Sequence, residues 1–465
     1  MLFLVIMVVY FVAMVAIGLL SRGIARGADN FFVAGRKQST FFVAGSLVAT
    51  IIGGSATIGL AGLGFTRGLT GIWWLLVGSI GLVVLGLFLV KKVREFGLYT
   101  LPELVEKQYG SRVALAASIL IVVAWLGVVA GQILAAGKIF SVMGIGSPAL
   151  WMIIFTAVFV FYVIVGGQYA VIGTDVVQAI IIYVGIFAGL PALFVAVGGW
   201  NGLSSSLAPA KFAFPLSSSF SGLDLVSYLL LVGLTYVVGP DMYSRVFCAR
   251  DVKTARKSVF WTAALIAPLA LAITLFGMGA VVLFPKIAPE QAFPMVITGV
   301  LPPILGGLVL AALVAAVMSS ADTCLLSAST ILSVDIIGRL KPSLSQEKIV
   351  YISRWAVLVL GIASLALALF LKGVISALLF AYTIYTSGVI LPVLAGFYKD
   401  RLKVTPLAAL VAIIGGGLTA LVSKTLGIKY LDLGGLFISA LLLFTVSLIE
   451  NRMRSRAIDV LPDIQ

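Results

Sequence analysis

One turn of a very apolar segment of this sequence carries a cluster of oxygen-bearing side chains. Within residues 300–335, this turn contains Ser319, Ser320, Asp322 and Thr323. A carboxylate at the centre of a membrane-spanning helix costs about 2.5–3.5 kcal/mol, so such a residue is a functional hypothesis by default. Oxygen ligands alone suit a hard cation. The alternative interpretation is that the hydroxyls bond back to their own helix.

Two other apolar segments contain residues that a helix accommodates poorly. The segment 42–66 has two glycines at 53–54, and the segment 223–247 contains Gly239 and Pro240. Each glycine costs about 1 kcal/mol against alanine in a helix interior, and proline removes a helix hydrogen bond. Irregular backbone at membrane depth is tolerated only where it is buried or lines a cavity. The first break therefore predicts freed carbonyls that bind a cation, or a small-residue face for close helix packing.

A second carboxylate, Asp175, stands with Gln178 at the start of the segment 172–197. One interpretation is a helix N-cap that complements the helix dipole. The other is a carboxylate on an ion path at the cytoplasmic side. The chain has two Cys and no His, which argues against a disulfide framework or a zinc site. The lack of His also removes the commonest proton shuttle.

The elements that position these residues follow from composition. Of 465 residues, 62% are hydrophobic and 10% are charged, whereas a soluble domain carries roughly a quarter charged residues. A membrane-spanning helix needs about 20 apolar residues. We therefore predict an all-α membrane protein with about thirteen spans, near residues 1–20, 42–66, 71–91, 113–137, 149–166, 172–197, 223–247, 258–284, 300–335, 350–371, 374–396, 404–422 and 431–450.

The positive charges predict the orientation of these spans. With the proposed spans, 24 of the 31 Lys and Arg residues, Arg245 among them, fall on one side. Because cytoplasmic loops are rich in Lys and Arg, we expect the N-terminus outside and the C-terminus in the cytoplasm of a multi-pass cell-membrane protein. The net charge of +14 is then a topology signal. The expected surroundings are a lipid bilayer, without a nucleic-acid partner.

The two broken spans begin two similar five-span blocks, 42–197 and 223–396. Paired broken helices in two halves point to an inverted-repeat transporter with sites near the midplane. A block of five spans gives the two halves opposite orientations, as inverted repeats require. We expect one transmembrane domain with a leading helix at 1–20 and two trailing helices at 404–450.

Five ordered motifs make the chain resemble the sodium:solute symporter family, which includes sodium/glucose, sodium/proline and sodium/sialic acid cotransporters. The motifs are the break at 49–54, GGQYAVIGTDVVQ at 166–178, GPDMYSRVFCARDVKTARKS at 239–258, AAVMSSADTCLLSAST at 315–330 and YTIYTSGVILPVLAGFY at 382–398. The resemblance implies the LeuT-type fold. It also implies Na⁺-coupled import of a small organic solute by alternating access.

The resemblance further implies a sodium site of three carbonyls and two hydroxyls. By residue-by-residue correspondence, these belong to Ala49, Ile52, Ala316, Ser319 and Ser320. Five neutral oxygens bind Na⁺ without a buried charge that would hold it too tightly. Some members have a second sodium site nearer the cytoplasm, which corresponds to Asp175, Ser319, Asp322 and Thr323. This chain departs by having Asp322 where those members carry a hydroxyl, so Asp322 could bind Na⁺, carry a proton or pair with a neighbour.

The sequence indicates the solute-binding positions less clearly than the sodium ligands. Positions that contact sugar in the glucose carriers are apolar here, for example Ile51 and Ala56, and no Arg lies in the third core helix to clamp a carboxylate. A small amino acid or a monocarboxylate is the expectation. The candidates for the cavity are Ser55, Thr57, Trp73, Trp74, Gln132, Thr235 and Tyr236, with Tyr382 and Tyr385 as an outer lid. For the aromatic residues, an interfacial belt is the competing interpretation.

Three alternatives to sodium symport stay open at this stage. A proton-coupled carrier of the same fold would titrate Asp322 or Asp175. A membrane sensor or enzyme is disfavoured, since the sequence has no His and no metal-ligand cluster. Broken helices in both halves suit a carrier better than a channel. We therefore predict a transporter that is not an enzyme, works as a monomeric unit and uses Na⁺ as its coupling ion.

Overall fold

The computed structural model describes residues 2–141, 144, 146–371, 373–426 and 431–459. Across these ranges, regular structure is helical, and β-structure is limited to two isolated bridges. In a bilayer no water satisfies exposed backbone groups, so helices that bond internally are the viable spanning structure for such apolar segments. The all-α prediction is confirmed.

Short 3-10 or π-helical segments, marked η, interrupt or join the α-helices. Up to residue 206, the elements are α1 (Leu2–Ser21), α2 (Ala28–Val33), η1 (Ala34–Arg36), α3 (Thr40–Ile51), η2 (Ser55–Gly59), α4 (Leu60–Arg67), η3 (Gly68–Ile72), α5 (Trp73–Val84), η4 (Leu85–Leu89), α6 (Val90–Glu95), α7 (Leu101–Tyr109), α8 (Ser111–Ser141), α9 (Pro148–Ala196) and α10 (Gly199–Ser206).

The second half of the chain is built in the same way. Its elements are η5 (Pro209–Phe212), α11 (Gly222–Tyr228), η6 (Leu229–Gly233), α12 (Leu234–Val237), α13 (Pro240–Cys248), α14 (Val252–Leu283), η7 (Pro289–Gln291), α15 (Ala292–Gly299), α16 (Pro303–Thr330), η8 (Ile331–Ile337), α17 (Gly338–Leu340), α18 (Gln346–Phe370), α19 (Val374–Tyr385), η9 (Thr386–Ile390), α20 (Leu391–Gly396), α21 (Lys399–Leu402), α22 (Pro406–Leu426) and α23 (Leu431–Asp459).

Eleven helices of the described chain are long and apolar enough to cross a bilayer. The two longest, Ser55–Glu95 with 41 residues and Pro148–Ala196 with 49, are each at least twice the roughly 20 residues of one crossing. Each contains a glycine with positive φ, 68° at Gly68 and 50° at Gly167. A glycine tolerates this left-handed backbone, so the chain can turn at both positions. The total of thirteen spans stays a prediction.

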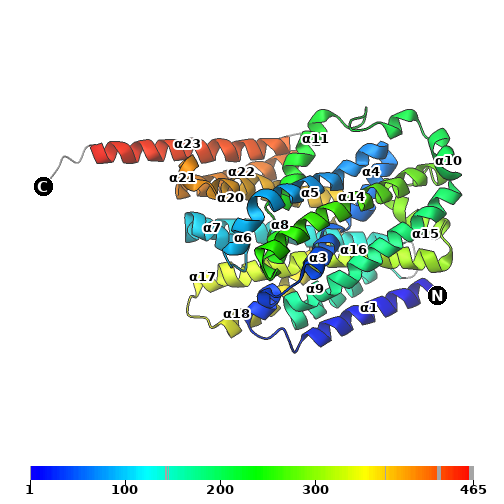
Figure 1. Ribbon diagram of the computed structural model, residues 1–465, viewed down its shortest axis with the longest axis horizontal. Helices are drawn as coiled ribbons and strands as arrows, with labels where there is room; N and C mark the ends of the chain where they lie inside the picture. The colour runs from blue at the N-terminus through cyan, green and yellow to red at the C-terminus, as the bar shows by residue number, and fades with distance from the viewer. Residues whose placement is uncertain (1, 142–143, 145, 372, 427–430, 460–465) are drawn as a thin grey trace.

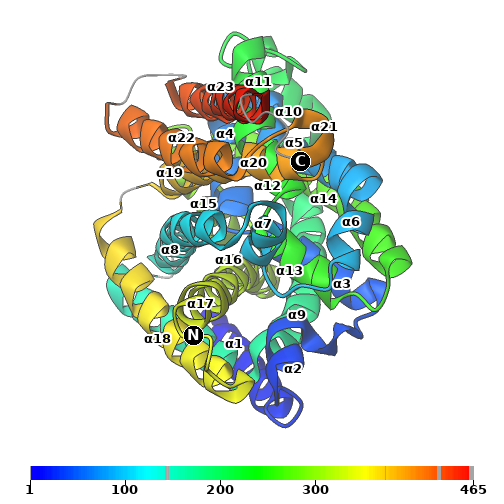
Figure 2. The same cartoon turned by 90° about the vertical axis from the view of Figure 1, so that its left-hand side faces the viewer.

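Helix α16 lies inside the bundle. Viewed along the helices, it is enclosed by neighbours that include α1, α8, α9 and α18 (Figure 2). Every side chain from 309 to 330 is buried. The hydroxyl and carboxyl groups of α16 therefore face protein, which explains how a polar cluster can exist in this apolar segment.

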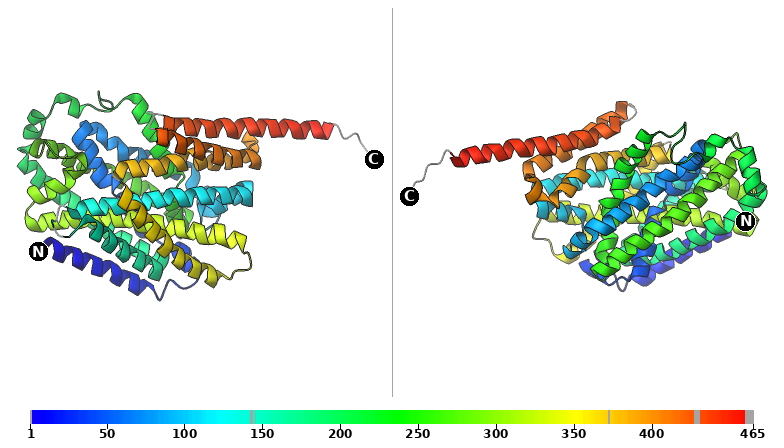
Figure 3. Two further views of the ribbon diagram at one scale, coloured as in Figure 1. Left: turned by 180° about the vertical axis from the view of Figure 1, so that it is seen from behind. Right: turned by 45° about the horizontal axis from the view of Figure 1, so that its top comes forward.

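Helix α1 begins at one end of the bundle, and α23 ends at the other (Figure 1). The chain therefore crosses the bundle an odd number of times. Helices α22 and α23 pack on each other, and α23 extends beyond the bundle (Figure 3).

Both predicted helix breaks are confirmed. Helix α3 ends at Ile51, Ile52 has non-helical angles (φ −83°, ψ 72°), and helical structure resumes at Ser55. Between α12 and α13, Val238 and Gly239 are extended. Pro240 then opens α13, in the first turn of a helix where a missing N–H costs nothing.

The packing of α14 against α4 predicts a stability effect at Gly277. A Cβ added there would clash with the backbone carbonyl of Ala61, whereas one added at Gly222 meets nothing closer than Leu216 at 3.9 Å. Overpacking costs about 1–3 kcal/mol, so Gly277→Ala should lower the thermal unfolding midpoint in detergent. Gly222→Ala is the matched control and should leave the midpoint unchanged. Equal effects of the two changes would contradict the packing argument.

Candidate functional site

The break in α3 lies against the middle of α16, and hydroxyls of α16 bond to the freed carbonyls of α3. Ser319 Oγ donates to the carbonyl of Ala49 at 2.8 Å and to that of Ala316 at 3.0 Å. Ser320 Oγ donates to the carbonyl of Thr50 at 2.6 Å. Ile52, the fifth predicted ligand, is fully buried at the first non-helical position of the break. The structure thus gathers the five residues that the resemblance implies around one junction.

The donors at this junction suit a small hard cation. Carbonyl and hydroxyl oxygens are neutral, and each serine hydroxyl has one donor and two acceptor sites. A hydroxyl that donates to a carbonyl can rotate and direct a lone pair at an ion instead. Oxygen-only coordination favours Na⁺, Ca²⁺ or Mg²⁺ over transition metals, and the lack of a carboxylate at this junction favours the ion of lowest charge.

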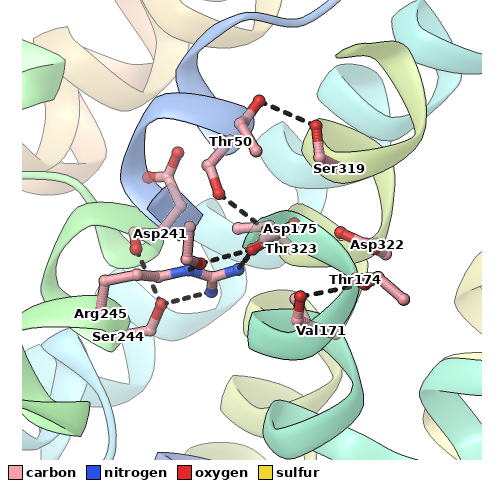
Figure 4. Close-up of polar contacts among 12 residues, drawn as sticks. Thr50, Val171, Thr174, Asp175, Asp241, Ser244, Arg245, Ser319, Asp322 and Thr323 are labelled. Atoms are coloured by element: carbon pink, nitrogen blue, oxygen red, sulfur yellow. Dashed lines mark hydrogen bonds and ion pairs between the residues drawn. The ribbon is translucent and has the colours of Figure 1, made fainter. Parts of the chain in front are cut away.

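Immediately beside this junction lies a buried ion pair that sequence reasoning missed. The side chains of Arg245 on α13 and Asp175 on α9 are both 0% exposed, and Arg245 Nη2 lies 3.1 Å from Asp175 Oδ2. Arg245 Nη2 also donates to the hydroxyl of Thr323, and Nε donates to Ser46 Oγ at 3.0 Å. Nη1 donates to Ser244 Oγ at 2.9 Å. Figure 4 shows the guanidinium directed into the centre of this group.

Two interpretations of these residues are therefore wrong. Asp175 is not an N-cap, because α9 is already helical before it and its carboxylate pairs with Arg245. Arg245 does not belong to a cytoplasmic loop, because it lies within α13, five residues after Pro240, and its side chain is buried. The signal was present in the sequence, since a buried carboxylate such as Asp175 requires a partner.

The other buried carboxylate, Asp322, accepts a hydrogen bond from the hydroxyl of Tyr162. Its Oδ1 atom and that of Asp175 have no hydrogen-bond partner in the part of the chain that the structure describes. With both carboxyl groups ionised, the cluster of Asp175, Arg245 and Asp322 carries one net negative charge, which a proton or a cation would neutralise. Of the four residues predicted for a second sodium site, Asp175 and Thr323 already contact the guanidinium of Arg245.

A narrow pocket adjoins this junction between the α3 break and the middle of α16. Five of the predicted solute residues line it, namely Ser55, Gln132, Thr235, Tyr236 and Tyr382. The lining also includes residues that sequence reasoning did not select, among them Thr50, Gly53, Trp125, Asp241, Ser320 and Cys324. Gln132 Oε1 accepts from the backbone N–H of Gly54 at 2.6 Å, so this side chain also holds the α3 break.

The other predicted solute residues lie outside the pocket lining. The Thr57 hydroxyl bonds to the carbonyl of Gly53 at 2.9 Å. The Trp73 indole donates to the carbonyl of Pro215 at 2.9 Å and stacks on Phe214. The Tyr385 hydroxyl donates to the carbonyl of Val238 at 2.6 Å, so it fixes the second break.

Trp74, the last of this group, packs edge-on against Tyr228. The two tryptophans, Trp73 and Trp74, therefore pack on the loop that contains Pro215 and on α11, outside the lining of the pocket.

Two broken helices, an internal pocket and an adjoining oxygen cluster define a secondary transporter. The chain belongs to the sodium:solute symporter family, whose model matches residues 31–416. It is a Na⁺-coupled transporter rather than an enzyme, and Na⁺ is its coupling ion. The resemblance predicted from the motifs is confirmed.

Two relatives illustrate the similarity in sequence. The chain is 27% identical over 478 residues to the sodium/glucose cotransporter of Vibrio parahaemolyticus, covering 94% of this chain and 87% of that protein. It is 28% identical over 404 residues to sodium/myo-inositol cotransporter 2 of Sus scrofa, covering 77% of this chain. The matched region spans 60% of the length of the pig protein.

Solved structures show the same fold. A Na⁺-coupled sialic acid symporter in a substrate-bound outward-open state superposes with a TM-score of 0.85 at 18% identity, covering 97% of this chain and 98% of that one. The transporter MhsT in complex with L-phenylalanine superposes with a TM-score of 0.56 at 14% identity, covering 89% and 98%. The chain therefore has the LeuT-type fold.

The Asp175–Arg245 pair predicts strong energetic coupling. Asp175→Asn or Arg245→Gln alone should lower the free energy of unfolding by about 3–5 kcal/mol, because each leaves an unpaired charge in the interior. The double variant should recover roughly half of that loss or more, since neither charge remains. Thermal unfolding of the four proteins in detergent measures the cycle. Losses that simply add would show that the two side chains act independently.

Proposed function

We propose that this protein imports a small organic solute by alternating access, driven by Na⁺ that binds at Ala49, Ile52, Ala316, Ser319 and Ser320. The observation that carries the proposal is the pair of bonds from Ser319 to the carbonyls of Ala49 and Ala316. The bond to Ala49 joins α3, which opens the first proposed repeat (42–197), to α16 in the middle of the second (223–396). An ion at this junction favours the arrangement in which the two helices are together.

The pocket and the sodium junction share backbone. Thr50, Gly53 and Ser320 line the pocket, and the Thr50 carbonyl is bonded by Ser320. An ion that orders the α3 break therefore also completes one wall of the solute pocket. Entry of one charge down the membrane potential supplies about 2.3 kcal/mol per 100 mV.

We propose one sodium ion for each transport cycle, and the position of Arg245 supports this. Its guanidinium already contacts Asp175 and Thr323, so a second ion there would have to displace a buried arginine. We further propose that the N-terminus is outside, that the C-terminus is cytoplasmic and that a single chain is the working unit.

Replacement of Na⁺ tests this proposal. Solute uptake into vesicles should cease when choline or K⁺ replaces Na⁺. The double change Ser319→Ala with Ser320→Ala should raise the half-maximal Na⁺ concentration about tenfold or more, since a hydrogen-bonding group on a charged partner is worth about 1.5–3 kcal/mol. The Na⁺ dependence of wild-type uptake should give a Hill coefficient near one.

Ser329→Ala is the matched control, because Ser329 is buried on the same helix but bonds to its own backbone at Leu326. It should leave the sodium dependence unchanged. Uptake that persists without Na⁺ would overturn sodium coupling. An unaltered half-maximal concentration in the double variant would remove the two hydroxyls from the site.

The net negative charge of the ionised cluster favours one second candidate, proton-coupled transport through the carboxyl group of Asp322. A proton on Asp322 would neutralise the cluster and could travel with the solute. We expect instead that a pH gradient alone drives no uptake and that Asp322→Asn keeps Na⁺-driven uptake. Measurement of uptake under an imposed pH gradient without Na⁺ decides the question. Proton-driven uptake in the wild type that is lost in Asp322→Asn would favour the second candidate.

A further inference from the structure

The solute pocket contains one formal charge. Of the described residues that line it, Asp241 is the only one with an ordinarily charged side chain. Asp241 is the second residue of α13, directly behind the second helix break, and it is only partly buried because it borders the pocket. A carboxylate so placed acts on whatever enters the pocket.

This carboxylate forms no ion pair with Arg245, although the two residues lie one turn apart on α13 and attract each other. Arg245 pairs with Asp175, and Asp241 forms no ion pair within the described ranges of the chain. Figure 4 shows the Asp241 carboxylate directed away from the guanidinium and toward the broken end of α3. The backbone N–H groups of Asp241 and Met242 bond to it, and a helix N-terminus favours negative charge. A carboxylate has about four acceptor sites, so capacity remains for a ligand.

The pocket walls beside Asp241 are aromatic. Trp125, Tyr236 and Tyr382 all line the same space, and Trp125 is 1% exposed with no hydrogen-bond partner in the described chain for its Nε1 atom. A positively charged nitrogen is attracted to the faces of such rings, and the attraction is stronger when water is excluded. A carboxylate and three aromatic rings form a setting for an amine or a quaternary ammonium.

Three of the remaining polar groups of the lining already bond within the protein, whereas Ser55, Tyr236 and Tyr382 add hydroxyls to it. The Thr235 hydroxyl bonds to the Val232 carbonyl at 2.6 Å, and the Ser320 hydroxyl bonds to the Thr50 carbonyl at 2.6 Å. Gln132 Oε1 is taken by the backbone of Gly54. A monocarboxylate without an amine would meet the like charge of Asp241.

We propose that the transported solute carries a positively charged nitrogen, which lies between the Asp241 carboxylate and the rings of Trp125, Tyr236 and Tyr382. The inference rests on the proposed function and names its solute class: an amine, an ammonium compound or a zwitterionic amino acid. It differs from the glucose and myo-inositol named for the relatives, and it narrows the expectation from the sequence by removing monocarboxylates.

Matched solute pairs test the proposal by thermal stabilisation of the purified protein in Na⁺, since a ligand that binds the folded state raises the unfolding temperature. Each pair keeps one carbon skeleton with and without the charged nitrogen. The pairs are L-alanine and L-lactate, L-proline and cyclopentanecarboxylate, choline and 3,3-dimethylbutanol, and D-glucosamine and D-glucose. We expect stabilisation by a nitrogen-bearing member at a concentration at least tenfold lower than its partner needs. Stabilisation by D-glucose or L-lactate as strong as by its partner would overturn the proposal.

Variants at Asp241 assign the preference to this carboxylate. Asp241→Asn should abolish the preference within the pairs, whereas Asp241→Glu keeps the charge and should retain it in part. Stabilisation by Na⁺ alone, measured in the same variants, reports on the fold and the sodium site. A preference that survives in Asp241→Asn would remove Asp241 from solute recognition. Such a result would leave Na⁺ coupling intact, because coupling fails only if the wild type shows no response to Na⁺.

Discussion

Every backbone group that a helix break frees inside the membrane must find another partner, and this constraint organises the centre of the protein. The carbonyls at the end of α3 accept hydrogen bonds from hydroxyls of α16, and Gln132 of α8 accepts from the N–H group of Gly54. The second break is held by Tyr385 of α19. The break residues are thus fixed by helices far away in the sequence, so the irregular backbone is positioned as firmly as the regular helices around it.

Much of the fold could be predicted because apolar segments and helix-breaking residues are local signals. Glycine and proline destabilise the interior of any helix, so the breaks at Gly53, Gly54 and Pro240 could be predicted, and the structure confirms their positions. The tertiary contacts of a side chain, in contrast, are not determined by its neighbours in the sequence. Arg245 looks like one more basic residue after an apolar run until α9 places Asp175 beside it. Trp73 looks like a cavity residue until the loop at Pro215 covers its indole.

The sodium junction and the neighbouring cluster differ in how they handle charge. At the junction all ligands are neutral, so an ion can bind and leave without exposing a bare carboxylate. One helix turn further along α16, Thr323 contacts Arg245, whose guanidinium pairs with Asp175 inside the protein. The protein thus supplies its own cation at this second position, whereas the junction has none. The buried pair also anchors α13, which carries Asp241 one helix turn before Arg245.

The wall that the solute pocket shares with the sodium junction has a consequence for divergence within the family. Thermodynamic linkage requires that if sodium raises the affinity for the solute by some factor, the solute raises the affinity for sodium by the same factor. In the proposed mechanism Thr50, Gly53 and Ser320 border both the pocket and the ion site, so a new specificity created at those positions would alter the ion response as well. Specificity would change without that effect only at lining residues away from the junction, such as Trp125, Tyr236 and Asp241. Relatives of this chain are thus free to differ in cargo while they keep the same driving ion.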